Sequence, residues 1–352
     1  MTPSTRTIHD LPAPPSGATD WPWNANGPPA AATMADGSPW PRISIVTPSF
    51  NQAGFLEETI RSVLLQGYPN LEYIVIDGGS TDRSPEILER YGEHLTYWVS
   101  EPDRGQTHAI NKGFARATGE ILAYLNSDDH YQPGALLALA EAFHKAPDAD
   151  VIYGRLRYMA EDGTPQEVHA GRLESFADIA DVWYVWWCGR QFVQPEVFWR
   201  RRIAEACGLF REDLYYVMDY EYWLRMAAKG GRFVHFPREL ASFRRTENQK
   251  SQAAENVARE HLTVLKDYLW DAQMPLTRRH RRRMQADYLF DAHLRTIGDE
   301  HVAHSTGAAR RWSHLLAFCA RNPRVFASPL LHYRIGHWVL NRLNLLVGRK
   351  PR

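Results

Sequence analysis

ILAYLNSDD, residues 121–129, is the most informative stretch of the chain, because an apolar run ends abruptly in two adjacent carboxylates. The apolar run is typical of a buried strand. Asp128 and Asp129 repel each other, and carboxylates are costly to bury without partners. A hard divalent cation that bridges protein carboxylates and phosphate oxygens removes this cost. The stretch therefore indicates a core strand that ends at a Mg²⁺ or Mn²⁺ site, and chemistry on a substrate that carries a diphosphate.

The Asp128-Asp129 pair also has a purely structural interpretation. It precedes Gln132-Pro133-Gly134 and could cap the N-terminus of a helix over residues 135–143. The position of the pair directly after an apolar strand favours the metal site.

Strands and helices alternate along the first half of the chain. The residue pattern predicts strands over 43–47, 71–76 and 95–99 and helices over 55–66, 80–91 and 107–117. Such alternation predicts an α/β fold with a doubly wound, mostly parallel sheet and helices on both faces. Ligands bind beyond the carboxyl ends of the strands of these sheets. Four polar residues lie at or just beyond such ends, namely Asn51, Asp77, Asp103 and Asp128.

The chain divides by composition into four segments. Residues 1–40 are rich in Pro, Ala, Gly and Ser and are typical of a flexible arm, although three tryptophans could dock it on the body. Residues 41–150 form the first, nucleotide-binding half of the α/β domain, and residues 151–252 form a second half for the acceptor. Residues 253–352 have a helical pattern and form a basic C-terminal extension.

Charge is distributed unevenly, although the formal net charge of the 352 residues is zero. Residues 277–352 contain 15 Lys and Arg against 4 Asp and Glu, a net charge of +11. This favours an anionic partner such as a membrane surface, contacted by Arg278–Arg283 and the apolar stretches 315–318 and 338–347. A helical subdomain packed on the core explains the pattern equally well. We expect no nucleic-acid partner, because the excess of basic over acidic residues is confined to this segment.

The composition, 44% hydrophobic and 23% charged, is that of a globular protein. Cys188, Cys207 and Cys319 are odd in number and match no metal-binding spacing, which favours reduced thiols and a cytoplasmic location. The sequence shows no signal peptide and no run of about 18 apolar residues, so we expect no spanning helix. A cytoplasmic protein, peripheral to the inner face of the membrane, fits these features.

Several polar residues admit both a functional and a structural interpretation. Asp77 precedes Gly78-Gly79 and could bind a base or a ribose, or begin a turn. Asp103 could bind sugar hydroxyls. Arg104 and Lys112 could contact phosphates or remain solvated on the surface.

Two clusters in the second half of the domain are equally ambiguous. Asp219 could act as a general base on an acceptor hydroxyl, or lie on a surface helix that is stabilised by a Glu221–Arg225 pair. The aromatic residues between Trp183 and Trp187 could stack on a sugar ring. Core packing is the commoner role of tryptophan.

Taken together and in this order, six motifs resemble those of the family 2 inverting glycosyltransferases, which have the GT-A fold. The resemblance covers residues 41–251 and is closest to the bacterial branch that builds surface polysaccharides. The motifs are SIVTPSFN at 44–51, IDGGSTD at 76–82, SEPDRG at 100–105, NKG at 111–113, LNSDD at 125–129 and MDYEYWLR at 218–225.

The resemblance implies that a sugar moves from a nucleotide-diphosphate sugar to the hydroxyl of a saccharide or lipid-linked saccharide, in the synthesis of a surface polysaccharide or glycolipid. It implies that Asp219 is the catalytic base. Asp128 and Asp129 would hold Mg²⁺ or Mn²⁺, with Asp128 as the main ligand. The donor would be bound by Thr47, Pro48, Phe50, Asp77, Asp103 and, at the diphosphate, Lys112.

The chain departs from the family pattern at four positions. Asn126 and Gly78 stand where relatives often carry Asp. Met218 stands where they often carry Glu, and Thr246 where they often carry His. Asn126 removes one negative charge from the metal site. A non-catalytic sugar-nucleotide-binding protein on the same fold is therefore the alternative, although the retained acidic residues argue against it. A sugar-phosphate nucleotidyltransferase would need a Gly-rich, basic loop after the first strand, which residues 48–52 lack.

Overall fold

The computed structural model describes residues 6–15, 17–18, 20–246, 249–250, 253–304, 308–333 and 335. Contacts between residues divide the chain into two compact units. The first, here called the sheet unit, comprises Met1–Ile179 and Tyr184–Val257. The second, the helical unit, comprises Ala180–Trp183 and Ala258–Arg352.

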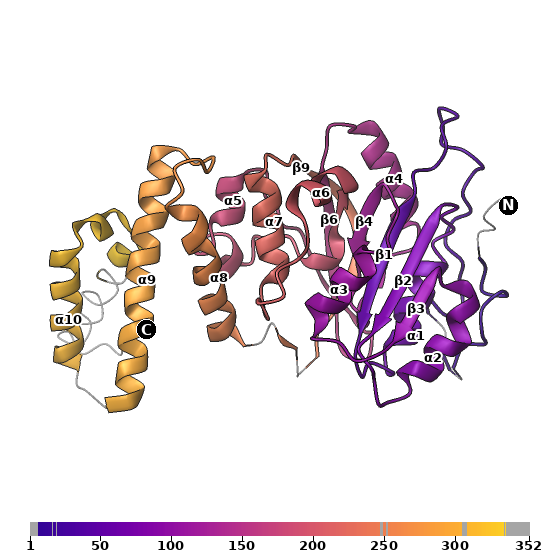
Figure 1. Ribbon diagram of the computed structural model, residues 1–352, viewed down its shortest axis with the longest axis horizontal. Coiled ribbons are helices and arrows are strands. Elements are labelled where there is room, and N and C mark those ends of the chain that lie inside the picture. Colours follow the sequence, from indigo (N-terminus) through magenta and orange to yellow (C-terminus); the bar gives the residue numbers. More distant parts are fainter. Residues whose placement is uncertain are drawn as a thin grey trace. The chain divides into compact units, whose positions relative to one another are not determined.

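A mixed β-sheet forms the centre of the sheet unit (Figure 1). Within the described residues, eight strands have the order β3-β2-β1-β4-β8-β6-β9-β5, and β7 pairs with β6. The strands are β1 (Ile43–Ser49), β2 (Leu71–Asp77), β3 (Tyr97–Ser100), β4 (Ile121–Tyr124), β5 (His130–Tyr131), β6 (Val151–Met159), β7 (Pro165–His169), β8 (Val197–Arg200) and β9 (Phe233–Arg244).

The order of the strands reverses at β1. This strand pairs in parallel with both β2 and β4, so the connection after β3 passes to the opposite side of β1. β8 then lies antiparallel between β4 and β6. Ligands of α/β proteins bind beyond the carboxyl ends of the strands at such a reversal. The expected α/β fold with a doubly wound, mostly parallel sheet is confirmed.

The helices of the sheet unit connect these strands. They are α1 (Leu56–Leu64), α2 (Ser84–Tyr91), α3 (Gln106–Phe114), α4 (Ala135–Lys145), α5 (Phe176–Ala180), α6 (Arg201–Cys207) and α7 (Met218–Ala228), with the 3₁₀ turns η1 (Gly92–His94), η2 (Trp186–Cys188) and η3 (Gln194–Glu196). β1 buries all seven of its residues, as a central parallel strand does. α3 packs closely on β1, since a Cβ added to Gly113 would lie 2.3 Å from Cγ1 of Val46.

The N-terminal segment lies against the sheet unit over its described residues. Trp21 donates from Nε1 to the carbonyl oxygen of Tyr131 at 2.8 Å, and Trp40 packs edge-on against Tyr68. The buried guanidinium of Arg61 on α1 donates to three carbonyl oxygens of the segment, those of Pro12, Pro22 and Trp23. The sequence left open whether the tryptophans dock this segment on the body. In the structure, the segment is docked.

The strand within residues 121–129 is shorter than the sequence suggests. β4 ends at Tyr124 rather than at Asp128, and a turn leads from there to β5. α4 begins after Gly134 and has no side-chain cap. The helix-cap interpretation of Asp128 and Asp129 is therefore wrong, because β5 separates the pair from α4.

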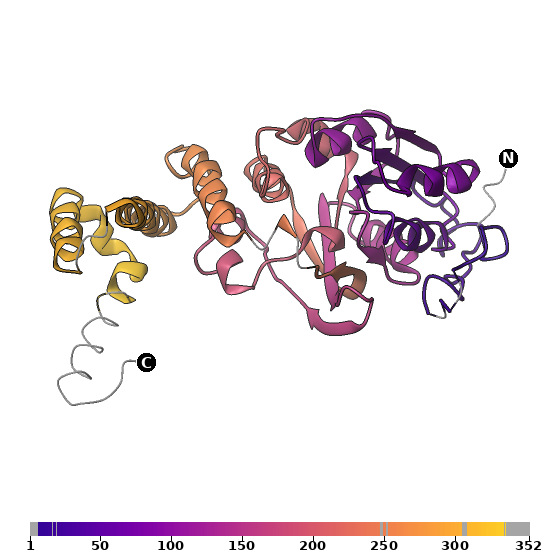
Figure 2. The same ribbon diagram turned by 90° about the horizontal axis from the view of Figure 1, so that it is seen from below.

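The helical unit includes α8 (Ala254–Leu269) from Ala258 onward, α9 (Arg278–His304), α10 (Ala308–Arg321) and η5 (Pro323–Ala327). α9 and α10 lie side by side (Figures 1 and 2), and the rings of His293 and Phe318 stack between them at 3.8 Å. The buried core of this unit includes Phe290, Leu315, Cys319, Val325 and Leu331. The expected helical extension is confirmed. No helix in the described part of the chain is long and apolar enough to span a membrane.

Candidate active site

Asp77 closes β2 and is completely buried. Its carboxylate accepts hydrogen bonds from the backbone N–H of Ser80 at 2.9 Å, the hydroxyl of Ser80 at 2.5 Å and the hydroxyl of Ser100 at 2.7 Å. Asp77 therefore ties the ends of β2 and β3 together. A base or a ribose would reach this carboxylate by replacing one of these contacts.

Asp103 lies beside the loop that follows β2. Its Oδ1 accepts from the N–H of Gly105 at 2.7 Å. A Cβ added to Gly78 would lie 2.8 Å from Oδ2 of Asp103, so the missing side chain at Gly78 makes room for this carboxylate. The loops after β2 and β3 thus meet at the carboxyl edge of the sheet, as the sequence predicts.

The three residues expected near the nucleotide base differ in exposure. Thr47 and Pro48 are buried, and the hydroxyl of Thr47 lies 3.1 Å from the hydroxyl of Tyr73. The ring of Phe50 is 60% exposed. Of the three, Phe50 alone presents its side chain to a ligand in this structure.

Asn126 lies in a chain of side-chain amides. Gln106, the first residue of α3, donates from Nε2 to Oδ1 of Asn126 at 2.7 Å. Asn126 donates from Nδ2 to Oε1 of Gln194 at 3.2 Å, and Gln194 donates to the carbonyl oxygen of Tyr124 at 2.5 Å. The ammonium of Lys250 donates to Oε1 of Gln106 at 3.1 Å. Each amide therefore both donates and accepts, which links α3, η3 and the turn after β4.

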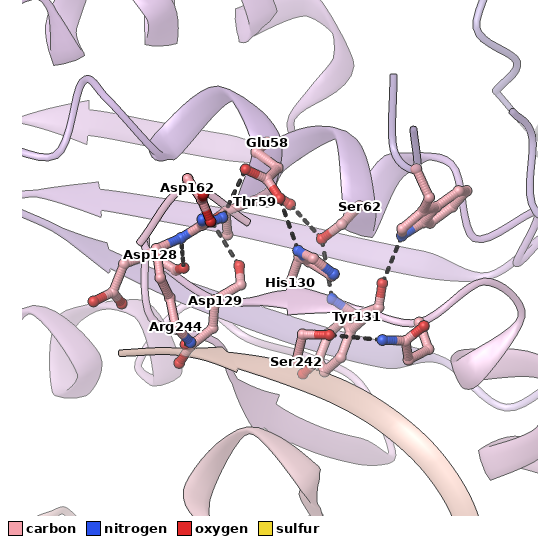
Figure 3. A network of polar contacts seen from close by, with 12 residues as sticks. Glu58, Thr59, Ser62, Asp128, Asp129, His130, Tyr131, Asp162, Ser242 and Arg244 are labelled. Atoms are coloured by element: carbon pink, nitrogen blue, oxygen red, sulfur yellow. Dashed lines mark hydrogen bonds and ion pairs between the residues drawn. The ribbon is translucent and has the colours of Figure 1, made fainter. Parts of the chain in front are cut away.

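Asp128 and Asp129 occupy different environments within this turn. Asp129 is 1% exposed, its Oδ1 accepts from the backbone N–H of Arg244 at 2.9 Å, and its Oδ2 has no hydrogen-bond partner among the described residues. The carboxylate of Asp128 is half-buried and points away from the guanidinium of Arg244 (Figure 3). Burial raises the pKa of Asp128. Burial, together with the negative charge of Asp128, raises the pKa of Asp129 well above its usual range.

This pair fits a divalent cation. Oδ2 of Asp129 is buried without a hydrogen-bond partner among the described residues and lies beside a second carboxylate. These oxygens are possible metal ligands, and a cation would offset the cost of burying their negative charge. Nowhere in the part of the chain that the structure describes do three His, Cys, Asp or Glu side chains gather to hold a metal. Mg²⁺ commonly uses one or two carboxylates and completes its shell with substrate phosphates and water. A diphosphate would therefore complete the site.

Asp219 lies in the first turn of α7. Its Oδ1 accepts from the N–H of Tyr220 at 2.7 Å. Burial raises its pKa from 3.8 to about 6, a value that suits a general base near neutral pH. The Glu221–Arg225 ion pair expected of a surface helix is present at 2.7 Å. Glu221 is nevertheless buried, so α7 is not the surface helix of the structural interpretation.

Tyr124, at the end of β4, connects the two acidic positions. Its ring is buried, and burial raises the pKa of its hydroxyl, with further contributions from the negative charge of Asp219 and then of Asp129. The negative charges of Asp219 and Asp129 therefore both oppose ionisation of the Tyr124 hydroxyl. The residue expected to be the base and one of the expected metal ligands thus lie at the same end of the sheet.

Two cations expected near phosphates have acidic partners in the structure. Lys112 on α3 pairs with Glu101, and Arg104 pairs with Glu212 at 2.6 Å. The side chain of Arg104 is 68% exposed, as in its structural interpretation, whereas that of Lys112 is 23% exposed. A phosphate would have to compete with Glu101 for Lys112.

The aromatic cluster divides into packed and exposed residues. Trp183 is buried, and Trp186 packs edge-on against Tyr220 at 4.8 Å and against Phe192 at 5.8 Å. Trp187 is 36% exposed. Core packing explains the first two, and Trp187 is the member of the cluster that could meet a saccharide.

Sequence reasoning overlooked the residues that orient the turn after β4. Three of them are Gln106, Gln194 and Arg244. A signal existed for Arg244, because an arginine that follows the largely apolar residues 240–243 of a strand needs buried partners. No local pattern identifies the two glutamines.

The mixed sheet, with acidic residues gathered at its carboxyl edge, defines the GT-A class of fold. Residues 44–207 match the family model described as glycosyl transferase family 2. Over those residues, which are slightly less than half of the chain, this protein is similar to that family.

Three similar proteins illustrate the relationship. Bacillus subtilis (strain 168) TuaG, whose name assigns it to teichuronic acid biosynthesis as a glycosyltransferase, is 34% identical over 145 residues, which is 39% of this chain and 56% of that protein. The S. aureus TarS 1–349 complex with UDP-GlcNAc has a TM-score of 0.55 at 18% identity and covers 70% of this chain and 71% of that one. The mannosyltransferase PcManGT of Pyrobaculum calidifontis, solved with GDP-Man and Mn²⁺, has a TM-score of 0.51 at 19% identity and covers 86% and 90%. These structures share the fold, whereas the match to TuaG spans little more than half of that protein.

Proposed function

We propose that the chain is an inverting glycosyltransferase that moves a sugar from a nucleotide-diphosphate sugar to an acceptor hydroxyl, in the synthesis of a surface polysaccharide or glycolipid. The observation that carries the proposal is the desolvated carboxylate of Asp219, with a pKa of about 6, at the same end of the sheet as Asp129. A carboxylate of this pKa is ionised at neutral pH and basic enough to accept a proton during the reaction.

In the proposed reaction, Asp219 takes the proton of the acceptor hydroxyl. The acceptor oxygen forms a bond to the anomeric carbon, while the bond from that carbon to the diphosphate oxygen breaks on the opposite face. The nucleoside diphosphate leaves with the bonding electrons, and the configuration at the anomeric carbon inverts. Asp219 then releases the proton to solvent. Mg²⁺ or Mn²⁺ at Asp128 and Asp129, when bound, supplies positive charge for the departing diphosphate.

The donor site would lie where the loops after β1, β2 and β3 meet. Phe50 would stack on the base, Asp77 and Asp103 would accept from base or sugar hydroxyls, and Lys112 would exchange Glu101 for a phosphate. Two of the structurally similar proteins support this class of donor by analogy. TarS was solved with UDP-GlcNAc, and PcManGT was solved with GDP-Man and Mn²⁺. Both ligands are nucleotide-diphosphate sugars.

Release of nucleoside diphosphate from a panel of sugar nucleotides, with Mn²⁺ and saccharide acceptors, tests the activity. We expect Asp219→Asn to abolish release and to keep nucleotide affinity. The matched control is Asp213→Asn, because Asp213 is exposed and pairs with Arg211 outside the site. Turnover by Asp219→Asn near that of the wild type would disprove the base. Nucleotide binding by the wild type without release from any donor would favour the non-catalytic alternative.

We further propose that the helical unit contacts an anionic membrane surface that carries a lipid-linked acceptor. The first two turns of α9, with Ala327 and Pro329, line a concavity of about 650 Å³ whose basic residues are Arg278, Arg279, His280, Arg282 and Arg283. Phe326, next to Ala327, is 55% exposed. Basic residues beside an exposed aromatic ring are typical of surfaces that bind anionic lipid headgroups. The apolar stretch 338–347 lies outside the described residues.

Co-sedimentation of the full chain with vesicles of anionic or neutral lipid tests the membrane contact. The substitution of Arg278, Arg279 and Arg282 by Gln should release the protein from anionic vesicles, and so should high salt. Arg83→Gln is the control, because Arg83 is exposed and lies on the sheet unit. Failure of the wild type to bind anionic vesicles would remove this proposal and leave the transferase proposal intact.

A further inference from the structure

Arg244, the last residue of β9, is buried against the turn that carries Asp128 and Asp129. Its side chain is 2% exposed. Nε donates to the carbonyl oxygen of Asp128 at 3.0 Å, and a terminal nitrogen donates to the carbonyl oxygen of Glu161 at 2.8 Å. The other terminal nitrogen pairs with the carboxylate of Glu58 on α1 at 2.7 Å. All three nitrogens of the guanidinium are thus engaged, and one of them holds the peptide between the two aspartates (Figure 3).

Asp129 is fixed on both sides by the same arrangement. Its Oδ1 accepts from the backbone N–H of Arg244 at 2.9 Å, and its carbonyl oxygen accepts from the hydroxyl of Thr59 on α1 at 2.7 Å. β9 and α1 therefore determine the direction in which the turn presents its carboxylates. Among the described residues, Asp128 makes no such contact to α1. Its side chain interacts with that of Gln249, and its carboxylate points away from Glu58 and Arg244 (Figure 3).

We infer that Arg244 is the positioning residue of the turn at residues 125–129, here called the metal turn, and that it gives the carboxylates of Asp128 and Asp129 different roles. Arg244 holds Oδ1 of Asp129 and the carbonyl oxygen of Asp128. The carboxylate of Asp128 is thereby directed to the cation as its main ligand, and Oδ2 of Asp129 makes the smaller contribution. This inference rests on the proposed transferase function and its divalent cation.

Charge alone does not explain why an arginine occupies this position. Glu58 balances the positive charge of Arg244, and Glu58 also contacts Nδ1 of His130 at 2.9 Å. The positive charge of Arg244 is thus shared with Glu58 and does not by itself neutralise the two carboxylates of Asp128 and Asp129. The geometry of the guanidinium is what the turn uses, because its three nitrogens donate to three separate acceptors. Lysine carries the same charge but lacks this fixed set of donors.

Arg244→Lys therefore separates geometry from charge. We expect the variant to fold and to bind UDP or GDP without metal within about twofold of the wild type. The increase in nucleotide affinity that Mn²⁺ produces, measured by calorimetry, should fall by about tenfold or more. Arg245→Gln is the matched control, since Arg245 is the next residue, is 45% exposed and pairs with Glu167. It should leave the Mn²⁺ effect unchanged.

A second pair of variants tests the inference without altering Arg244. Asp128→Asn should lower the Mn²⁺ effect on nucleotide affinity by about tenfold or more, because it removes the ligand. Asp129→Asn should lower it by about threefold at most, because the amide oxygen still accepts from the N–H of Arg244. Equal losses in the two variants would overturn the assignment, as would a full Mn²⁺ effect in folded Arg244→Lys.

The outcomes also separate this inference from the function on which it rests. A wild type that releases nucleoside diphosphate with a Mn²⁺ effect, and an Arg244→Lys variant that keeps that effect, would disprove the positioning role alone. A wild type whose nucleotide affinity is the same with and without Mn²⁺ would disprove both the positioning role and the metal at Asp128. A wild type that binds no nucleotide would contradict the proposed function.

Discussion

Gln106 donates a hydrogen bond from Nε2 to the side-chain oxygen of Asn126 at 2.7 Å. This contact occupies the only side-chain oxygen of Asn126. The side-chain nitrogen is engaged as well, because it donates to Gln194 at 3.2 Å. Asn126 therefore connects α3 to η3. Its side-chain amide has a structural role in the metal turn that a carboxylate could not fill completely.

Asn126→Asp is expected to destabilise the fold without improving the metal site. An aspartate can still accept from Gln106, but it cannot donate to Gln194, whose side chain is 6% exposed. A buried acceptor that loses its donor costs about 1–3 kcal/mol. We expect chemical denaturation to show a loss of stability in this range. The affinity for Mn²⁺ in the presence of UDP or GDP should rise by less than about threefold.

A tenfold gain in Mn²⁺ affinity by Asn126→Asp would contradict this explanation. It would show that the new carboxylate leaves Gln106 and turns to the ion. Gln106→Leu on the Asn126→Asp background then serves as the control. Removal of the competing donor should free the carboxylate and produce the gain that the single variant lacks.

Gly78→Ala should weaken donor binding and leave the fold intact. The new Cβ would lie 2.8 Å from Oδ2 and 3.0 Å from Cγ of Asp103, so the carboxylate must move. The group that moves is the end of a flexible side chain, and we expect the melting temperature to change by less than about 3 °C. The KM for the sugar nucleotide should rise by about tenfold if Asp103 binds the donor.

The control for this substitution is Gly54→Ala. No atom lies within 4 Å of a Cβ added to Gly54, so this variant adds the same methyl group without displacing a neighbour. Equal donor KM values for Gly78→Ala and the wild type would remove Asp103 from the donor site.

The parts of this structure that follow from local pattern could be predicted from the sequence. β1 and β2 are recognisable in the sequence as largely apolar runs. The polar residues that follow them indicate that a ligand binds at this edge of the sheet. Their convergence required only the rule that parallel strands end at the same edge. The expected role of Asp219 came from a family resemblance, because no local pattern distinguishes a partly buried acidic helix turn from a solvated one.

The contacts that orient the site could not be predicted in this way. Asp129 and the backbone of Arg244 are 115 residues apart, and Asn126 and Gln194 are 68 apart. Such pairs depend on the register of β9 and on the path of the chain through η3, which periodicity does not determine. The end of β4 at Tyr124 was missed for a related reason. Leu125 continues the apolar pattern, but the pairing with β1 ends before the polar turn begins.

Trp187→Ala is expected to weaken acceptor binding selectively. Trp187 is 36% exposed, whereas Trp186 packs against Tyr220, the neighbour of Asp219. The KM for a saccharide acceptor should rise by about tenfold, with the KM for the donor within about twofold of the wild type. Trp186→Ala should instead lower the melting temperature. A parallel rise in the KM values of donor and acceptor in Trp187→Ala would exclude the platform.

The pH dependence of transfer should report the pKa of Asp219. Burial raises this pKa to about 6, and the carboxylate acts as a base only when it is ionised. The value of kcat/KM should therefore rise with pH up to a plateau, with a midpoint near the pKa of the free enzyme. A profile that stays flat from pH 5 to about pH 8 would show that proton removal by Asp219 does not limit the reaction.

Asp219→Asn should also stabilise the protein, and the gain should depend on pH. The carboxyl group has a pKa of about 6 in the folded chain and 3.8 as its ordinary value, so the folded state binds more protons between these two values. Stability of the wild type therefore falls as the pH rises through this window, by on the order of 3 kcal/mol in total. An asparagine does not ionise and avoids that loss. Denaturation at pH 7.5 should thus show the variant to be more stable than the wild type, and the difference should vanish near pH 4. If Asp219→Asn stabilises the protein equally at pH 7.5 and near pH 4, the gain comes from packing. The ionised carboxylate of Asp219 then does not destabilise the folded state.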